Sequence, residues 1–313
     1  MTSQHLKTCA LAAISSVPAL ALSAMFAITS STAAHAQEKT VAARVTDTKT
    51  AERIEMVSGI RALGQRIGAA LCLAEAGVDK DANMKIASDS LAELANLVDV
   101  VENGSEELGR GKEEDRRVQG AINGMKLNWQ RFDQNVSMLI NGENVEENYD
   151  FLSRHNLNMS YASRDFLVRL MQVYVQPPEI LQSYALTLDI AARQRALTQQ
   201  MAKEACGLAT DNAVMGSVLR LKNASRLFDL SMTALRDGFP AAGVITPPSD
   251  EISSKVSAVY DDWQAVKADV NAVNAMGAID AAKAGELFQK MDGIYQQLEA
   301  IAELYIAASK FQG

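Results

Sequence analysis

The fold follows from the segment Ile54–Ala74, IEMVSGIRALGQRIGAALCLA, and from its counterpart Leu188–Leu208, LDIAARQRALTQQMAKEACGL. The second segment begins 134 residues after the first, and Arg-Ala-Leu, a glutamine and a cysteine keep the same spacing in both. Apolar residues recur at steps of three and four in each segment. Both segments are therefore predicted to form amphipathic helices.

The same 134-residue register extends well beyond these segments. Trp129-Gln130 falls on Trp263-Gln264, although the chain has only two tryptophans, and Gly104 falls on Gly238. Chance is a poor explanation for one register kept over a hundred residues. We interpret the chain as a tandem duplication with modules at residues 43–176 and 177–310.

Each module is predicted to contain four helices. In the first module, a second apolar stripe ends at Asn103-Gly104, which is a typical helix stop, and further helices are expected around Trp129 and Leu157–Leu170. Pro177-Pro178 separates the two modules. No segment alternates as strands do, so we expect an all-α protein made of two tandem four-helix bundles with up-down antiparallel helices.

The first 36 residues have the features of a cleavable signal peptide. A polar start with Lys7 precedes an apolar stretch, and Ala34-His35-Ala36 predicts cleavage before Gln37. An uncleaved anchor is the alternative, because the apolar stretch could span a bilayer. We favour export to the periplasm, and no other segment is apolar enough to predict a membrane span.

The balance of charge excludes one class of partner. Removal of Lys7 with the leader leaves 29 basic and 38 acidic residues, a net charge of −9. An acidic surface of this size argues against nucleic acid as a partner.

One side of the leading helix in each module carries the candidate binding residues. On a helical wheel, Arg61, Gln65 and Cys72 lie together and opposite the core positions Leu63 and Ile67. Arg195, Gln199 and Cys206 repeat the arrangement in the second module. This side is either a helix edge covered by its own bundle or a seam at which the two modules meet.

The seam interpretation carries two further hypotheses. Two converging guanidinium groups would repel one another unless an anion lay between them, and glutamine amides could complete its hydrogen bonding. Cys72 and Cys206 could form a disulfide that locks the modules together, or they could be buried, inert thiols.

These residues resemble a known family. Leu188–Lys203 is similar to the first-helix motif of the PilJ/NarX-like sensor module, which forms the periplasmic part of type IV pilus chemotaxis transducers and nitrate/nitrite sensor kinases. Ile54, Arg61, Leu63 and Gln65 match it more loosely. The resemblance implies a periplasmic four-helix bundle in which Arg61 and Arg195 clasp a small anion, with nitrate, nitrite or a carboxylate as candidates.

The sequence departs from the family at two positions that bear on the ligand. The family usually has an amide where this chain has Glu55 and Asp189, and acids near an anion site oppose binding. His155 is the only histidine after the leader, and no catalytic set, metal-ligand set or phosphate-binding loop is visible. We interpret Trp129 and Trp263 as core anchors, and the run Glu113-Glu114-Asp115 as a solvated helix start.

Taken together, the sequence predicts a soluble periplasmic sensor or binding protein without a cofactor, a metal or an enzymatic activity. A small anion would bind at Arg61, Arg195, Gln65 and Gln199. The alternative is a helical interaction protein that docks on a membrane sensor or chemotaxis protein and needs no ligand.

Overall fold

The computed structural model describes residues 49–175, 180–210 and 215–310, and all of its helices lie in one compact unit, Thr46–Gly313. The predicted signal peptide, its cleavage site before Gln37 and the Pro177-Pro178 junction lie outside the described residues.

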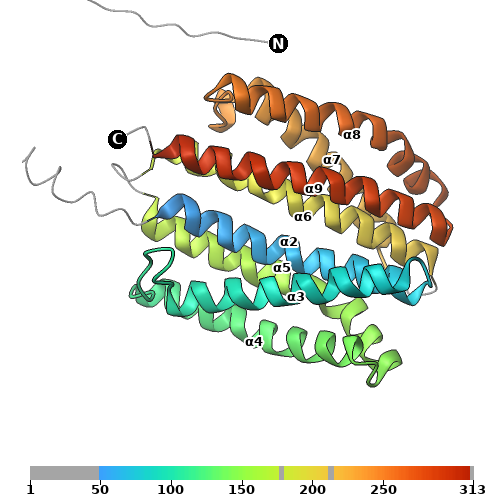
Figure 1. Cartoon of the computed structure of the whole chain (residues 1–313). Coiled ribbons are helices and arrows are strands. Elements are labelled where there is room, and N and C mark those ends of the chain that lie inside the picture. Colours follow the sequence, from blue (N-terminus) through green and yellow to red (C-terminus); the bar gives the residue numbers. More distant parts are fainter. Residues whose placement is uncertain (1–48, 176–179, 211–214, 311–313) are drawn as a thin grey trace, which may run out of the picture. The chain divides into compact units, whose positions relative to one another are not determined.

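Two groups of four long helices make up the described chain (Figure 1). The first group is α2 (Thr50–Glu75), α3 (Lys80–Asn103), α4 (Arg116–Ile140) and α5 (Val145–Tyr174). The second group is α6 (Gln182–Ala209), α7 (Ser217–Asp237), α8 (Asp250–Met276) and α9 (Ala281–Ser309), with a short 3-10 turn, η1 (Pro240–Ala242), before α8. The prediction of an all-α protein with two four-helix bundles is confirmed for this part of the chain.

Local sequence explains where the helices begin and end. The carboxylates of Asp115 and Asp280 and the hydroxyl of Ser249 accept backbone N–H bonds at the starts of α4, α9 and α8. Gly104 and Gly238 follow α3 and α7 with φ of 80° and 78°, a conformation that favours glycine. The stop predicted at Asn103-Gly104 is therefore confirmed.

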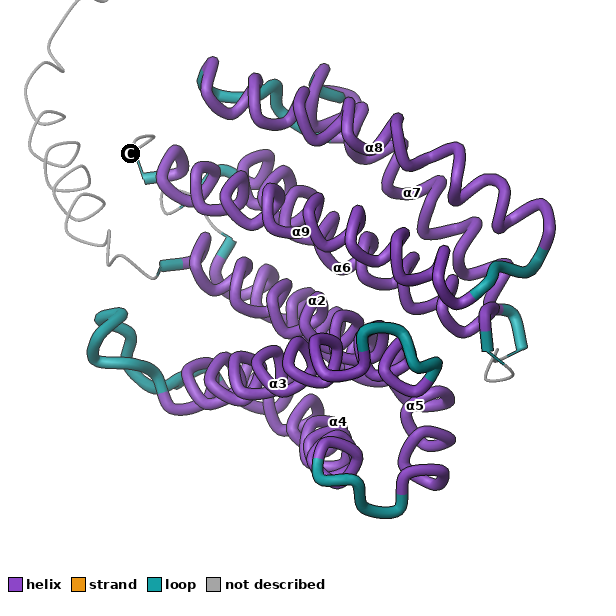
Figure 2. The backbone as a smooth tube through the Cα atoms, turned by 45° about the vertical axis from the view of Figure 1, so that its right-hand side comes forward, coloured by secondary structure: helices purple, strands orange, loops and turns teal. Residues whose placement is uncertain are grey.

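The two leading helices, α2 and α6, pack against one another at the centre of this unit (Figure 2). Helix α2 also packs on α3 and α5, while α6 packs on α7 and α9. Helix α9 makes an additional contact with α2. The face shared by α2 and α6 is called the seam below.

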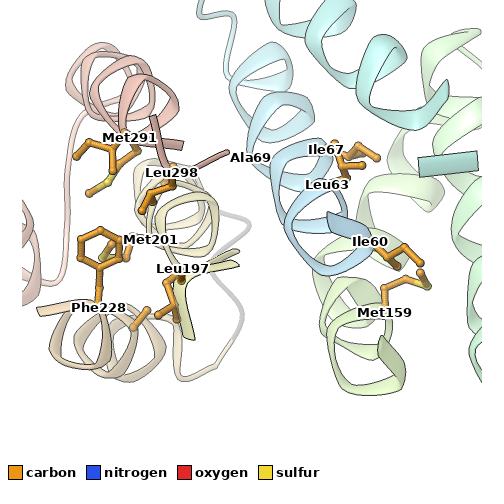
Figure 3. Packing of buried hydrophobic residues seen from close by; sticks show 14 of the residues in the cluster. Ile60, Leu63, Ile67, Ala69, Met159, Leu197, Met201, Phe228, Met291 and Leu298 are labelled. Atoms are coloured by element: carbon orange, nitrogen blue, oxygen red, sulfur yellow. The ribbon is translucent and has the colours of Figure 1, made fainter. Parts of the chain in front are cut away.

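Each leading helix turns its apolar side away from the seam into its own bundle. Leu63 and Ile67 point to one side of the seam, and Leu197 and Met201 point to the other (Figure 3). All four are buried, as predicted.

Two sequence interpretations need correction. Trp263 is fully buried and donates to Asp229, but Trp129 is only partly buried and packs at the edge of the core. Glu113 is not solvated. Its carboxylate lies 2.6 Å from Arg53 Nη1 and accepts a hydrogen bond from Tyr174, because α2 and α5 close over the start of α4.

Candidate functional site in the seam between the two bundles

The structure brings all six candidate residues to the seam. Arg61, Gln65 and Cys72 lie on α2, and Arg195, Gln199 and Cys206 lie on α6. Both arginines and both glutamines are buried, with Arg195 only 2% and Gln199 0% exposed. The seam is therefore shielded from water, and charges in it require partners within the protein or from a ligand.

Each arginine reaches across the seam to a carboxylate of the other bundle. Arg61 Nη2 lies 3.4 Å from Asp189 Oδ1, and Arg195 Nη2 donates to Glu55 Oε1. Asp189 and Glu55 are themselves 134 residues apart, so the two ion pairs are exchanged by the register of the sequence. These are the two acids that stand where the resemblance implies amides.

The two arginines are not equally well paired. Arg195 also lies 3.2 Å from Glu299 of α9, and although burial would lower its pKa, Glu55 and the groups around it outweigh that effect and raise it. Burial lowers the pKa of Arg61, which has Asp189 as its one counter-charge and Arg193 and Arg195 as positive neighbours. Arg61 is thus the more weakly compensated of the two.

The glutamines direct their donors away from the seam. Gln65 Nε2 donates to Ser160 Oγ of α5 at 2.7 Å, and Gln199 Nε2 donates to Asp292 Oδ1 of α9 at 3.1 Å. The carbonyl oxygens of both amides are buried without a partner among the described residues. Because an anion needs donors, these amides are poorly placed to bind one.

A third link between the bundles was not found from the sequence. Arg66 of α2 donates from Nε and Nη2 to the two carboxylate oxygens of Asp292 on α9, at 2.8 and 2.9 Å. Its guanidinium also lies 5.2 Å from the centre of the Tyr295 ring. Arg66 stood in the quoted motif, but nothing in the sequence indicated that Asp292 would face it.

At the far end of the seam, Cys72 and Cys206 are joined by a disulfide, with 6.2 Å between their Cα atoms. The bond connects α2 to α6 directly. It fixes the two bundles to one another at a point about three turns of helix from the arginines.

The described residues contain no cluster of three or more His, Cys, Asp or Glu side chains able to hold a metal ion. His155 is exposed, and its Nδ1 lies 3.0 Å from the carbonyl oxygen of Phe151. Among the helices of the described ranges, none has a stretch long and apolar enough for a membrane span.

Comparison with known proteins gives one match. Residues 180–286 match the family of type IV pili methyl-accepting chemotaxis transducer N-terminal domains, PilJ. The matched segment covers α6, α7, α8 and the start of α9, so the resemblance stated for the second half is confirmed. No curated protein and no solved structure matches the chain.

Proposed function

We propose that the protein is a sensor-type module of signal transduction that works in the periplasm and has no catalytic role. The PilJ match of residues 180–286 supports the sensory role, because the matched family is named for chemotaxis transducers. We also propose that the first half is a second copy of the same module. In support, α2 (Thr50–Glu75) moved by 134 residues falls on 184–209, against Gln182–Ala209 for α6.

The observation that carries the functional proposal is the crossed pair of ion pairs in the seam. The notebook of charges is balanced there, since two buried guanidiniums face two carboxylates, Glu55 and Asp189. An external anion would displace or oppose these carboxylates, and the geometry therefore disfavours the predicted site for nitrate, nitrite or a carboxylate at Arg61, Arg195, Gln65 and Gln199. We propose that the seam is a self-neutralised clamp that holds the bundles in one arrangement.

Calorimetry with nitrate tests this proposal. The wild-type protein should not bind nitrate, whereas the double variant Glu55→Gln with Asp189→Asn leaves the arginines without their main counter-charges. That variant should bind nitrate with a Kd of about 1 mM or tighter, a free energy of about −4 kcal/mol. Adding Arg61→Ala to the double variant should abolish the binding.

A matched control removes the same two charges from exposed positions, as in Glu147→Gln with Asp165→Asn. This control should behave as the wild type does. Nitrate binding by the wild type that disappears in Arg61→Ala would support an external-anion site and overturn the clamp. A folded double variant that binds no anion would also contradict the proposal.

A second candidate function, docking on a membrane sensor or chemotaxis protein without a ligand, is favoured by an open groove between α4 and α5. The groove has a volume of about 550 Å³, and Gly120 and Gly124 form part of its wall. A partner helix could approach this wall closely because glycine has no side chain. Retention of a specific envelope protein by the wild type but not by Gly124→Leu, without added small molecules, would support this function.

A further inference from the structure

A cavity of about 160 Å³ lies beside the disulfide, at the end of the seam away from the arginines. It is bordered by α2 and α5 of the first bundle and by α6 and α7 of the second. Its wall combines apolar and polar groups, including Cys72. The apolar groups are Leu71, Leu152 and Leu157, and the main polar groups are Tyr149, Asn156, Lys203, Glu204 and Arg220.

The polar part of the wall carries an excess of positive charge. Glu204, whose side chain is 3% exposed, accepts from Arg220 Nε and Nη2 at 2.9 and 3.0 Å. The same carboxylate lies 3.2 Å from Lys203 Nζ. One buried carboxylate thus faces two cations, and a second anion would complete the balance.

Lys203 has a donor to offer. Its ammonium has three N–H groups, of which one faces Glu204 and one donates to Asn156 Oδ1 at 3.2 Å. Within the described residues, the third has no acceptor in the protein. Burial lowers the pKa of the Lys203 ammonium despite the nearby Glu204 carboxylate, and a bound anion would offset that loss of solvation.

The wall is held in place by bonds to the backbone. Asn156 Nδ2 donates to the carbonyl oxygen of Gly64 at 2.7 Å, and the hydroxyl of Tyr149 donates to that of Leu71. Gly68 lies under these groups, where a Cβ would be 2.8 Å from Asn156 Nδ2. The binding groups therefore need little ordering when a ligand enters.

The polar cluster is confined to one side of the disulfide. In the 134-residue register, Lys203, Glu204 and Arg220 correspond to Ala69, Ala70 and Ile86 of the first half. On that other side, α9 packs against α2, and Gly285 leaves room for Val78, whose Cγ1 would be 2.6 Å from a Cβ there. Packing of the bundles does not itself require the charged cluster, since the equivalent place is apolar and closed.

We infer that this cavity binds a small monocarboxylate with a compact apolar body. The carboxylate would lie against Lys203 and Arg220, and the body would lie against Leu71, Leu152 and Leu157. The volume is close to that of an engineered cavity of ~150 Å³ that takes up benzene. As the ligand of a sensor this molecule rests on the proposed function, whereas its binding is tested independently.

Titration calorimetry of the oxidised protein with benzoate and with butyrate tests the inference. The wild type should bind at least one of these acids, and Lys203→Met should weaken that binding at least tenfold. Benzamide, which has the shape of benzoate without its charge, should bind at least tenfold more weakly. The control Lys222→Met removes an exposed lysine of α7 and should leave the affinity unchanged.

A second variant, Leu157→Trp, fills the apolar part of the cavity and should also abolish binding, while thermal unfolding shows whether each variant is folded. Failure of both acids to bind the wild type would overturn the inference, as would folded Lys203→Met and Leu157→Trp variants that bind normally. The clamp variant Glu55→Gln with Asp189→Asn should retain benzoate binding, so failure of the cavity and failure of the clamp are distinguishable.

Discussion

At the scale of single residues, the seam is governed by the cost of burying charge. A guanidinium that is withdrawn from water needs a counter-charge at short range, and Glu55 and Asp189 provide one for each arginine. The same two acids would be unfavourable beside an external anion. A substitution from amide to acid at two related positions is thus enough to convert an anion-binding pair of arginines into an internal clamp.

Removal of one partner should show this dependence. Arg195→Met leaves Glu55 buried without its main counter-charge, and we expect the free energy of unfolding to fall by about 3–5 kcal/mol. Adding Glu55→Gln should recover part of the loss. Urea denaturation measures both, and Lys85→Ala, which breaks an exposed pair with Asp89, should change stability by no more than ~0.5 kcal/mol. An equally small effect of Arg195→Met would contradict the clamp.

At the scale of elements, the two halves agree in their connections as well as in their helices. An isolated β-bridge joins Ser105 to Arg110 after α3, and a second joins Phe239 to Val244 after α7, 134 residues later. A glycine in a left-handed conformation precedes each bridge. These loops turn the chain sharply, so that the third helix of each bundle can return antiparallel to the second.

Gly104 should tolerate no side chain. A Cβ there would lie 2.4 Å from the carbonyl oxygen of Arg110, and the backbone φ of 80° is unfavourable for alanine. We expect Gly104→Ala to destabilise the protein by about 1–3 kcal/mol. Gly124→Ala is the matched control, because this glycine lies within helix α4 with open space around it, and alanine there should stabilise by about 0.5–1 kcal/mol. Equal midpoints of thermal unfolding for the two variants would contradict this account.

At the scale of the whole molecule, three connections hold the bundles together from one end of the seam to the other. They are the crossed ion pairs near the start of α2, the bidentate contact of Arg66 with Asp292, and the disulfide toward its end. Connections spread along the helix resist both sliding and rotation of one bundle against the other. The described unit should therefore unfold cooperatively.

Loss of the disulfide should weaken that coupling. The bond closes a loop with a sequence separation of 134 residues, for which chain entropy gives a stabilisation of up to roughly 5 kcal/mol. We expect Cys72→Ala with Cys206→Ala to lower the free energy of unfolding by about 2–5 kcal/mol. Thiol labelling of the unreduced, denatured wild type should find neither cysteine free, and labelling of both would rule the bond out.

Much of the architecture could be predicted because helical periodicity and breakers are local signals. The apolar positions around Leu63 and Leu197 and the stop at Gly104 all appear as expected. Trp129 and Glu113 were misjudged, since the burial of a side chain depends on which helix covers it. That information is absent from the residues next to it.

The sequence by itself determined the helices, their register and the side of each leading helix that carries arginine, glutamine and cysteine, because these follow from residue spacing. Only the tertiary structure decided which groups those side chains meet. Arg61 and Asp189 are 128 residues apart, and Arg66 and Asp292 are 226 apart. Electrostatic partners depend on distance and desolvation in space, and packing of the two bundles sets both.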